Sequence, residues 1–539
     1  MNFFLIIAKE NLEKSLLILF LSIISGCAGG SVIILALNGI QEIIVGRNYL
    51  FFAICLPLSA ILFVSTKRIS QNQSIIIVED IQEKLILRVA NSFRQTTLDF
   101  IEKQDLANIY SQIVNTQTIT YSITKSINMF QNMMTIFTLW IYIFCLSPQM
   151  GLFVLIFFFL SICIYEFQQG LLKPVVKKEH HHEIEMYRMF DHILSGFKEI
   201  KLNAKKNDAI YKQLVDHINQ NQNHRLIKLF SYVQFNQFVN SSFLFVMGII
   251  AFILPSYYSH SVITQLLTIT LYVWLPTEFI LAVIPDVSSG EYSLEQLFSL
   301  TKDANISDET ITELFNPANE TVKTFNTLRF CNLTFRYELD KSIKGFSIGP
   351  FNLTIRSAEI VFIIGGNGSG KTTFLKLLTG LYQPTSGKIL MDDKKANMDS
   401  YRHLFSSIFS DFILFEKLYG LDEVEDQQVM DLLVQMDLGH KTQWVENQFS
   451  SLKLSTGQRK RLALIIALLE DRPIYIFDEW AADQDAHFRE YFYESLLPSL
   501  KNKGKTVISV THDDSFFHVA DKIIKLDYGE IIQKDEFIS

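Results

Sequence analysis

Long apolar runs occupy the first 290 positions of the chain and are missing from the remainder. A helix that crosses about 30 Å of hydrocarbon needs roughly 20 consecutive apolar residues. Runs of suitable length lie at about 15–37, 49–66, 128–146, 150–167, 238–256 and 261–285. The pattern predicts six transmembrane helices.

Lysine and arginine are unevenly distributed among the connections between these spans. The connection 67–127 carries seven of them and 168–237 carries eleven, whereas the other three connections together hold only Arg47. Basic connections stay on the cytoplasmic side of a membrane. We therefore expect both termini and both long connections in the cytoplasm. Their helical spacing of apolar residues indicates that the spanning helices continue there before they turn.

The composition changes after residue 300, where segment 301–325 loses the apolar runs and becomes polar. We expect a transmembrane domain over 1–300, a linker over 301–325 and a second domain over 326–539. The net charge of −8 argues against a nucleic-acid partner, because phosphate backbones bind basic surfaces. The five cysteines have no metal-ligand spacing, so we interpret them as apolar side chains.

A glycine-rich loop in the second domain has the pattern G-x-x-x-x-G-K-[ST], as Gly365–Thr372 reads GGNGSGKT. The apolar run Ile360–Ile364 before it predicts a buried strand, and Thr373–Leu378 after it predicts a helix. A triphosphate is wrapped by backbone N–H groups, which requires residues without a Cβ atom. The helix N-terminus also favours an anion. This loop predicts binding of a nucleoside triphosphate, with Lys371 on the phosphates.

Two carboxylates follow another apolar stretch, Ile474–Phe477, about 105 residues after the loop. Asp478 is placed to hold Mg²⁺ together with the hydroxyl of Thr372. Glu479 is the candidate general base that activates the attacking water. The pair predicts hydrolysis of the bound triphosphate.

The segment LSTGQ at 454–458 resembles the signature motif of ATP-binding cassette (ABC) transporters, usually written LSGGQ. Two further segments agree with this resemblance: 482–485 lies at the D-loop position, and 511–514 resembles the switch-histidine segment with His512. Tyr337 stands where the family stacks an aromatic ring on adenine. The resemblance implies six transmembrane helices of the ABC exporter type fused to an α/β phosphate-loop nucleotide-binding domain.

In that family, the signature serine and glycine of one subunit contact the γ-phosphate held by the other subunit. The resemblance gives this role in trans to Ser455 and Gly457, which implies a dimer. It implies Glu479, His512 and Lys371 as catalytic residues and Thr372 and Asp478 as Mg²⁺ ligands. The residues expected to bind ATP are Tyr337, Gly365, Gly366, Asn367, Gly368, Ser369, Gly370, Lys371, Thr372, Thr373, Ser455, Gly457, Gln458 and Asp485.

One position departs from the family pattern. The family has a glutamine about 40 residues after the phosphate loop, where it contacts Mg²⁺, and this chain has Ser410 there. A serine side chain is too short to span the same gap.

Several segments resemble the cyclic-peptide exporter branch of the family, which exports lasso-peptide microcins and peptide siderophores. They lie at 196–203, 401–420, 454–464, 478–485 and 509–514, and the glycine-rich part of the first span, Gly26–Asn38, resembles the same branch. The resemblance implies a homodimeric exporter of a cyclic or modified peptide or siderophore in the bacterial inner membrane. A lipid flippase or multidrug exporter has the same architecture and stays open, as does a regulatory protein of the family that does not pump.

Two features of the first domain have no assigned role. His180, His181 and His182 form a run, but adjacent positions on a helix do not share one face, so a solvated helix surface is favoured over a metal site. Glu278 lies in the sixth predicted span, where a carboxylate is costly. It either contacts a cationic cargo or proton, or pairs with a neighbouring helix or lies near the membrane interface.

Overall fold

The computed structural model describes residues 12–103, 106–303, 324–337, 346–396, 401–421 and 424–536. The chain divides into two compact units, one of Met1–Thr96 with Phe100–Thr312 and one of Thr97–Asp99 with Glu313–Ser539. We call them the membrane unit and the ATP unit. The domain limits at 300 and 326 stay predictions, because residues 304–323 lie outside the described part.

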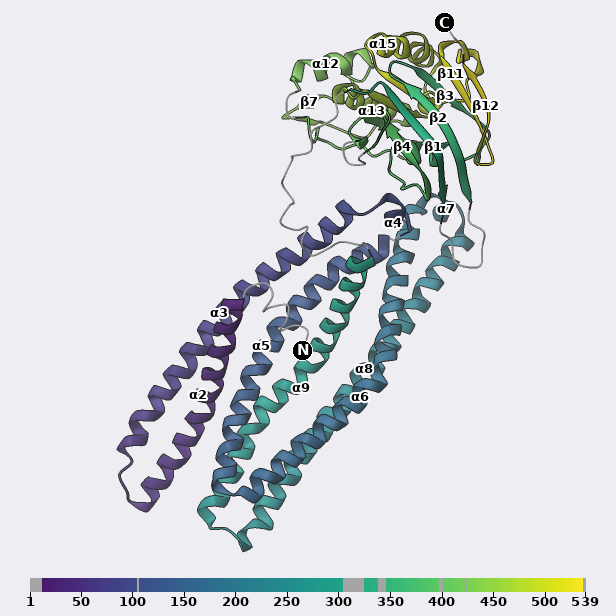
Figure 1. The fold of residues 1–539 in the computed structure, drawn as a ribbon. Helices are drawn as coiled ribbons and strands as arrows, with labels where there is room; N and C mark the ends of the chain where they lie inside the picture. The colour runs from purple at the N-terminus through teal and green to yellow at the C-terminus, as the bar shows by residue number, and fades with distance from the viewer. Residues whose placement is uncertain are drawn as a thin grey trace. The chain divides into compact units, whose positions relative to one another are not determined.

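Long helices make up the membrane unit (Figure 1). Their bounds are α2 Leu12–Val45, α3 Leu50–Gln95, α5 Leu106–Leu146, α6 Pro148–Ser195, α8 Ala204–Phe252 and α9 His260–Asp303. The short helices are α4 Leu98–Lys103, α7 Phe197–Leu202 and the 3₁₀ helix η1 Leu254–Ser256. Within the described residues, six helices are long and apolar enough to cross a membrane. The six predicted spans are confirmed.

These helices extend well beyond the length that a bilayer requires. Helix α6 has 48 residues, which is about 72 Å at 1.5 Å per residue. Ser147, the residue before the helix, caps its start: the side chain accepts a hydrogen bond from Met150 N at 3.4 Å. Helix α8 begins in the same way, since Asn203 accepts from Lys206 N at 3.1 Å. The capped starts and the excess length agree with the prediction that the helices continue beyond the spans.

The glycines of α2 lie against α5. A Cβ atom on Gly26 would collide with Met134 and would come within 2.7 Å of the carbonyl oxygen of Gln131. Gly30, one turn further, faces the side chain of Thr138 in the same way. Small residues at this spacing let two helix backbones approach each other. Nearby, Gln131 Nε2 donates to Ser25 Oγ at 2.8 Å, so the buried polar groups at this contact are paired.

The ATP unit contains a mixed six-stranded sheet in the order β12-β11-β3-β10-β9-β6 and an antiparallel four-stranded sheet in the order β2-β1-β4-β5 (Figure 1). The strands of the first sheet are β3 Ile360–Ile364, β6 Phe405–Ile408, β9 Ile474–Asp478, β10 Thr506–Val510, β11 Lys522–Asp527 and β12 Glu530–Glu536. Those of the second are β1 Thr327–Arg336, β2 Ser347–Arg356, β4 Ser386–Met391 and β5 Lys394–Lys395. A small hairpin joins β7 Trp444–Val445 to β8 Gln448–Phe449.

Helices and short helical turns cover the larger sheet. They are α10 Lys371–Leu378, α12 Asp426–Gln435, α13 Thr456–Glu470, α14 Ala486–Glu490, α15 Leu497–Asn502, the 3₁₀ turns η3 Trp480–Asp483 and η5 Asp514–Val519, and the π-helical turn η4 Tyr491–Leu496. Strands β3, β10 and β9 are parallel neighbours. The residues that follow them therefore meet at one edge of the sheet, the carboxyl edge where open α/β sheets bind ligands.

Candidate active site

The phosphate loop connects β3 to α10, as the sequence predicts. Gly365 has φ +153°, and a Cβ atom there would collide with the carbonyl oxygen of Leu526. Gly370 has φ +98° and precedes the first residue of α10. Lys371 is 6% exposed, and its Nζ donates to the carbonyl oxygens of Gly365 at 3.0 Å and Gly366 at 3.1 Å. The lysine thus ties the end of the loop to two carbonyl groups at its start.

A cavity of about 390 Å³ lies over this loop. Asn367, Gly368, Ser369, Gly370, Lys371, Thr372, Thr373, Glu479 and Phe346 line it. The loop predicted for phosphate and the predicted base therefore share one pocket. Ser369 Oγ is buried there without a hydrogen-bond partner, which leaves it available to a phosphate oxygen.

The predicted Mg²⁺ ligands lie side by side. Thr372 Oγ1 donates to Asp478 Oδ2 at 3.0 Å, and Asp478 is 2% exposed at the end of β9. Burial raises the pKa of Asp478, and hydrogen bonds from Thr372 and from Ser410 act in the opposite direction. A buried carboxylate with two hydroxyl neighbours is a set of hard oxygen donors, which suits Mg²⁺. Ser410, which stands where the family has a glutamine, therefore forms hydrogen bonds with the carboxylate of Asp478.

Glu479 occupies the centre of the site. Its backbone has φ +52°, a left-handed conformation that turns the chain sharply after β9. Its Oε1 lies 3.2 Å from Nε2 of His512 and 3.8 Å from Nζ of Lys371. His512 follows β10 directly, so the loop lysine, the carboxylate and the histidine come from three adjacent strand ends.

The signature segment begins helix α13. Ser455 caps the helix: its hydroxyl accepts from Gln458 N at 3.4 Å, and Gln458 Oε1 accepts from Ser455 N at 3.1 Å. A Cβ atom on Gly457 would lie 2.6 Å from the carbonyl oxygen of Asp483. Among the described residues, neither Ser455, Gly457 nor Gln458 lines the phosphate pocket of its own chain.

Two basic residues that the sequence did not single out join the signature helix to the segment after the base. Lys460 is 4% exposed, and its Nζ lies 2.6 Å from the carbonyl oxygen of Glu479 and 2.6 Å from Asp483 Oδ2. Arg461 Nη2 donates to Asp485 Oδ2 at 2.9 Å. Their partners lie 19 to 24 positions further along the chain, so only the tertiary structure brings them together.

Asp485 has two contacts in its own chain. Its side chain accepts from Phe488 N at 3.0 Å and so caps α14, and this hydrogen bond, followed by the Arg461 guanidinium, lowers its pKa. The predicted contact of Asp485 with nucleotide stays a prediction.

Tyr337 lies close to the phosphate-loop helix, and its hydroxyl is 3.1 Å from Thr373 Oγ1 and 3.3 Å from the hydroxyl of Tyr382. Among the described residues, the aromatic ring that lines the phosphate pocket belongs to Phe346, which is 40% exposed. The sequence reasoning missed Phe346. Stacking of Tyr337 on adenine stays a prediction, and residues 338–345 between these two lie outside the described part.

In the membrane unit, Glu278 of α9 pairs with the neighbouring helix α8. Its carboxylate accepts from Asn236 Nδ2 at 3.4 Å and from Asn240 Nδ2, and on its own helix from Trp274 Nε1 at 3.3 Å. The expectation that Glu278 pairs with a neighbouring helix is confirmed. Asn240 Oδ1 is buried there without a partner among the described atoms.

Two cavities lie among the long helices. One, of about 320 Å³, is lined almost wholly by apolar side chains of α5, α6, α8 and α9, including Trp140 and Phe243. The other, of about 640 Å³, contains a lysine and several amides of α3 and α5, including Lys67, Gln71 and Asn132.

Models of known protein families match both units. The model "ABC transporter transmembrane region" matches residues 15–275, and the model "ABC transporter" matches residues 348–482. A solved structure of a bacterial Atm1-family ABC exporter with ATP bound has the same fold, with a TM-score of 0.79 over 98% of this chain and 95% of that chain, at 17% identity. The chain therefore has the fold and the domain order of an ABC exporter half transporter.

Curated relatives match part of this half transporter. The ATP-binding protein SyrD of Pseudomonas syringae pv. syringae is 48% identical over 217 residues, which are 39% of this chain and 38% of the relative. An ATP-dependent lipid A-core flippase of Ralstonia nicotianae is 30% identical over 224 residues, 38% of this chain and 37% of the relative. The half transporter thus matches less than two-fifths of the length of these two proteins.

Proposed function

We propose that this half transporter forms a homodimer in the bacterial inner membrane and uses ATP to export a cyclic or modified peptide, of the microcin or siderophore kind. The observation that carries the proposal is the meeting of Lys371, Asp478, Glu479 and His512 at three adjacent strand ends, in a chain that also has six candidate spanning helices. The first feature supplies ATP hydrolysis, and the second supplies a path across the bilayer.

In the proposed reaction the loop amides and Lys371 hold the phosphates. Lys371 exchanges the carbonyl oxygens of Gly365 and Gly366 for phosphate oxygens, because an anion is the stronger partner for an ammonium group. Glu479 lies within reach of this pocket and takes the proton of the attacking water. His512 holds the carboxylate and the γ-phosphate in position. Thr372 and Asp478 would hold Mg²⁺, and the ion would supply positive charge beside the phosphates.

The pocket arrangement supports a dimer. Ser455 and Gly457 do not line the pocket of their own chain, among the described residues. Ser455 is exposed at the start of α13, so it is accessible to a second copy. A partner chain then completes each ATP site with its own Ser455 and Gly457. In this proposal both termini lie on the cytoplasmic side of the membrane, together with the two basic connections. ATP is available on that side.

The cargo assignment depends on the resemblance of the segments 196–203, 401–420 and 478–485 to cyclic-peptide exporters. Two cavities in the membrane unit, one apolar and one rich in amides, suit a molecule with apolar side chains and exposed peptide groups.

A lipid flippase is the second candidate, because a relative at 30% identity is named a lipid A-core flippase. The large number of apolar side chains exposed on the membrane helices fits either cargo. A regulatory protein that does not pump is disfavoured by the presence of both Glu479 and the signature segment.

The test compares two strains, one with the native chain and one with Glu479→Gln, which is expected to bind ATP without turning it over. Mass spectrometry measures small peptides and siderophores in the medium and in the cell pellet. A peptide that disappears from the medium and accumulates in the mutant cells identifies the cargo. If the peptide profiles agree and membrane lipids redistribute instead, the flippase replaces the peptide exporter.

A further inference from the structure

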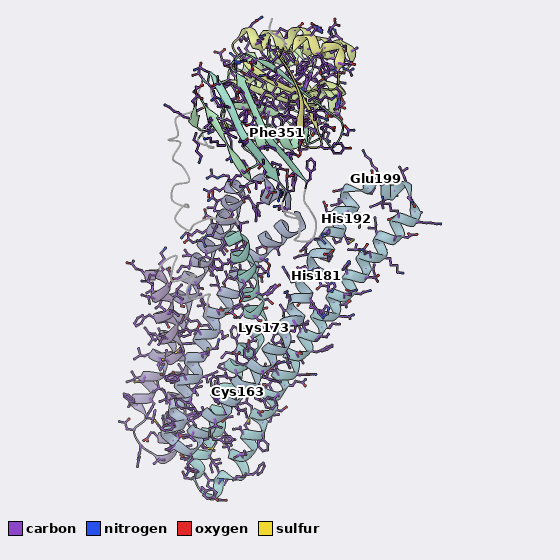
Figure 2. The ribbon with its side chains drawn as sticks, turned by 45° about the vertical axis from the view of Figure 1, so that its right-hand side comes forward. Cys163, Lys173, His181, His192, Glu199 and Phe351 are labelled. Atoms are coloured by element: carbon purple, nitrogen blue, oxygen red, sulfur yellow. The ribbon has the colours of Figure 1, made fainter. Side chains whose placement is uncertain are left out.

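Lys460 of helix α13 is a buried cation. Lysine usually keeps its ammonium group in water, and the exposed side chain of Lys173 on α6 is an example (Figure 2). Lys460, in contrast, is 4% exposed. Because an ion that leaves water needs fixed partners in exchange, the contacts of Lys460 indicate what its charge does.

The ammonium group of Lys460 binds the turn that follows the proposed base. Its Nζ donates to the carbonyl oxygen of Glu479 at 2.6 Å and pairs with Asp483 Oδ2 at 2.6 Å. In the opposite direction, Nε1 of Trp480 donates to the carbonyl oxygen of Lys460 at 2.8 Å, and Trp480 is 1% exposed. Lys460 is therefore joined to this turn through both its side chain and its backbone.

Glu479 has a backbone conformation that needs such support. Its φ of +52° lies in the left-handed region, which residues with a Cβ atom rarely adopt. A conformation of this kind persists only where the surrounding structure holds it. Glu479 N donates to the carbonyl oxygen of Val510 at 3.2 Å, and its own carbonyl oxygen accepts from Lys460 and, at 3.4 Å, from Ala482 N. The peptide groups on both sides of Glu479 are thus fixed.

These peptide groups determine where the carboxylate points. In the observed conformation, Oε1 of Glu479 lies 3.2 Å from Nε2 of His512 and 3.8 Å from Nζ of Lys371, and the side chain lines the phosphate pocket. A general base must lie within hydrogen-bond reach of the proton that it takes. A displacement of about 1 Å can lower a rate by about 100-fold. The contact that holds the backbone of Glu479 therefore bears on the rate.

We propose that Lys460 is a positioning residue for ATP hydrolysis: its ammonium group holds the carbonyl group of Glu479 and so keeps the carboxylate in the phosphate pocket. Among the described residues, Lys460 itself does not line that pocket, so it acts through Glu479 alone. This inference rests on the proposed role of Glu479 as the base.

Lys505 provides a matched control at the other end of α13. Its Nζ donates to the carbonyl oxygen of Asp471 at 2.9 Å and pairs with Asp471 Oδ1 at 2.7 Å. Asp471 has φ +48° and directly follows the helix. A lysine thus holds the carbonyl group of a left-handed acidic residue here too. Neither Lys505 nor Asp471 is among the described residues that line the phosphate pocket.

The first test measures steady-state ATP hydrolysis by the full chain in detergent, at a temperature where tryptophan fluorescence shows every variant folded. Lys460→Met is expected to lower kcat by about 10-fold or more, because the base is misplaced. Its KM for ATP is expected to stay within about twofold of the native value, because the phosphate loop is intact. Lys460→Arg, which keeps a cationic donor, is expected to restore most of the rate. Native kcat in Lys460→Met, or an equal fall in Lys505→Met, would overturn the proposal.

The second test asks whether Lys460 acts through the base. In a chain that already carries Glu479→Gln, Lys460→Met is expected to change the residual single-turnover rate by less than about twofold, because the group that it positions is gone. A fall as large as in the native background would show a general effect on the fold of the site and would refute the positioning role.

The two tests also separate this inference from the proposed function. If Glu479→Gln by itself keeps the native rate of hydrolysis, Glu479 is not the base and both proposals fail. If Glu479→Gln abolishes hydrolysis while Lys460→Met keeps the native kcat, the proposed base stands and only the positioning role of Lys460 is wrong.

Discussion

The membrane unit and the ATP unit bury polar groups in opposite ways. Among the described residues, every buried polar side chain of the membrane unit is uncharged, whereas the ATP unit buries Lys371, Lys460, Lys522 and Asp478. In the membrane unit, many hydroxyl groups bond to their own helix, as Thr138 Oγ1 does to the carbonyl oxygen of Met134 at 2.9 Å, and others bond across helices, as Ser122 Oγ does to the carbonyl oxygen of Asp286 at 2.6 Å. The ATP unit thus buries ammonium groups against backbone carbonyl oxygens and a carboxylate, whereas the ion pair Glu179–Lys228 of the membrane unit stays 16% and 13% exposed.

The difference has a physical cause. A buried ion needs several fixed partners, and a sheet edge with three adjacent strand ends and their loops supplies them within a few ångströms. A helix pair has only the side chains of one face to offer. The half-buried ionisable side chains of the membrane unit have fixed partners too. Glu278 accepts hydrogen bonds from Asn236, Asn240 and Trp274, and Glu179 pairs with Lys228 at 2.7 Å.

The largest expected effect is a loss of ATP hydrolysis, and it shows whether one chain forms a complete ATP site. Ser455→Arg and Lys371→Ala are each expected to lower ATP hydrolysis by about 100-fold or more as homodimers, because each removes a contact to the phosphates. A mixed dimer of the two variants keeps one intact site if the signature acts in trans, and is expected to regain up to half of the native rate. A mixed dimer as inactive as its parents would show that each site is built within one chain.

The next effect tests the buried lysine. Lys460→Met is expected to destabilise the protein by about 2 kcal/mol, because the carbonyl oxygen of Glu479 and Asp483 lose their shared cation. This loss of stability is smaller than the loss expected for a fully buried ion pair, because the side chain of Asp483 is 47% exposed. Urea unfolding followed by tryptophan fluorescence measures it. The exposed Lys453→Met in the same segment is the control, and an equal loss there would refute a special role for Lys460.

In the membrane unit we expect close packing, rather than charge, to be the sensitive feature. Gly26→Ala forces α2 and α5 apart, and overpacking of this kind costs about 1–3 kcal/mol. Gly248→Ala is the matched control, since a Cβ atom there meets nothing within 4 Å. Thermal unfolding in detergent compares the two. Equal melting temperatures for both variants would show that the contact at Gly26 adapts without cost.

The smallest effect concerns the buried carboxylate. Because burial raises the pKa of Asp478, the folded protein without Mg²⁺ binds a proton more readily than the unfolded chain, and the charge costs stability as the pH rises through that pKa. Asp478→Asn is therefore expected to stabilise the metal-free protein at neutral pH. The gain is expected to shrink as the pH falls toward the ordinary carboxyl value of 3.8. Unfolding at several pH values checks it, and a gain that grows on acidification would reverse the sign.

The sequence alone determined the features that depend on neighbouring residues. The six apolar runs predicted the membrane helices because a bilayer demands a continuous apolar length. Each predicted span matches a described helix, except that residue 49 precedes α3 and residues 253–256 follow the end of α8. The loop Gly365–Thr372 and the pair Asp478–Glu479 were readable for the same reason: their chemistry is contained in a few consecutive positions between a strand and a helix.

The tertiary structure decided what depends on distant residues. The pairing of Lys460 with Asp483, the hydrogen bonds of Ser410 to Asp478 and the meeting of His182 with His217 join positions that 23, 68 and 35 residues separate. No local pattern encodes such pairs, because the face that a helix turns toward its neighbour follows from packing. For the same reason the cavities of the membrane unit emerged only from the assembled helices.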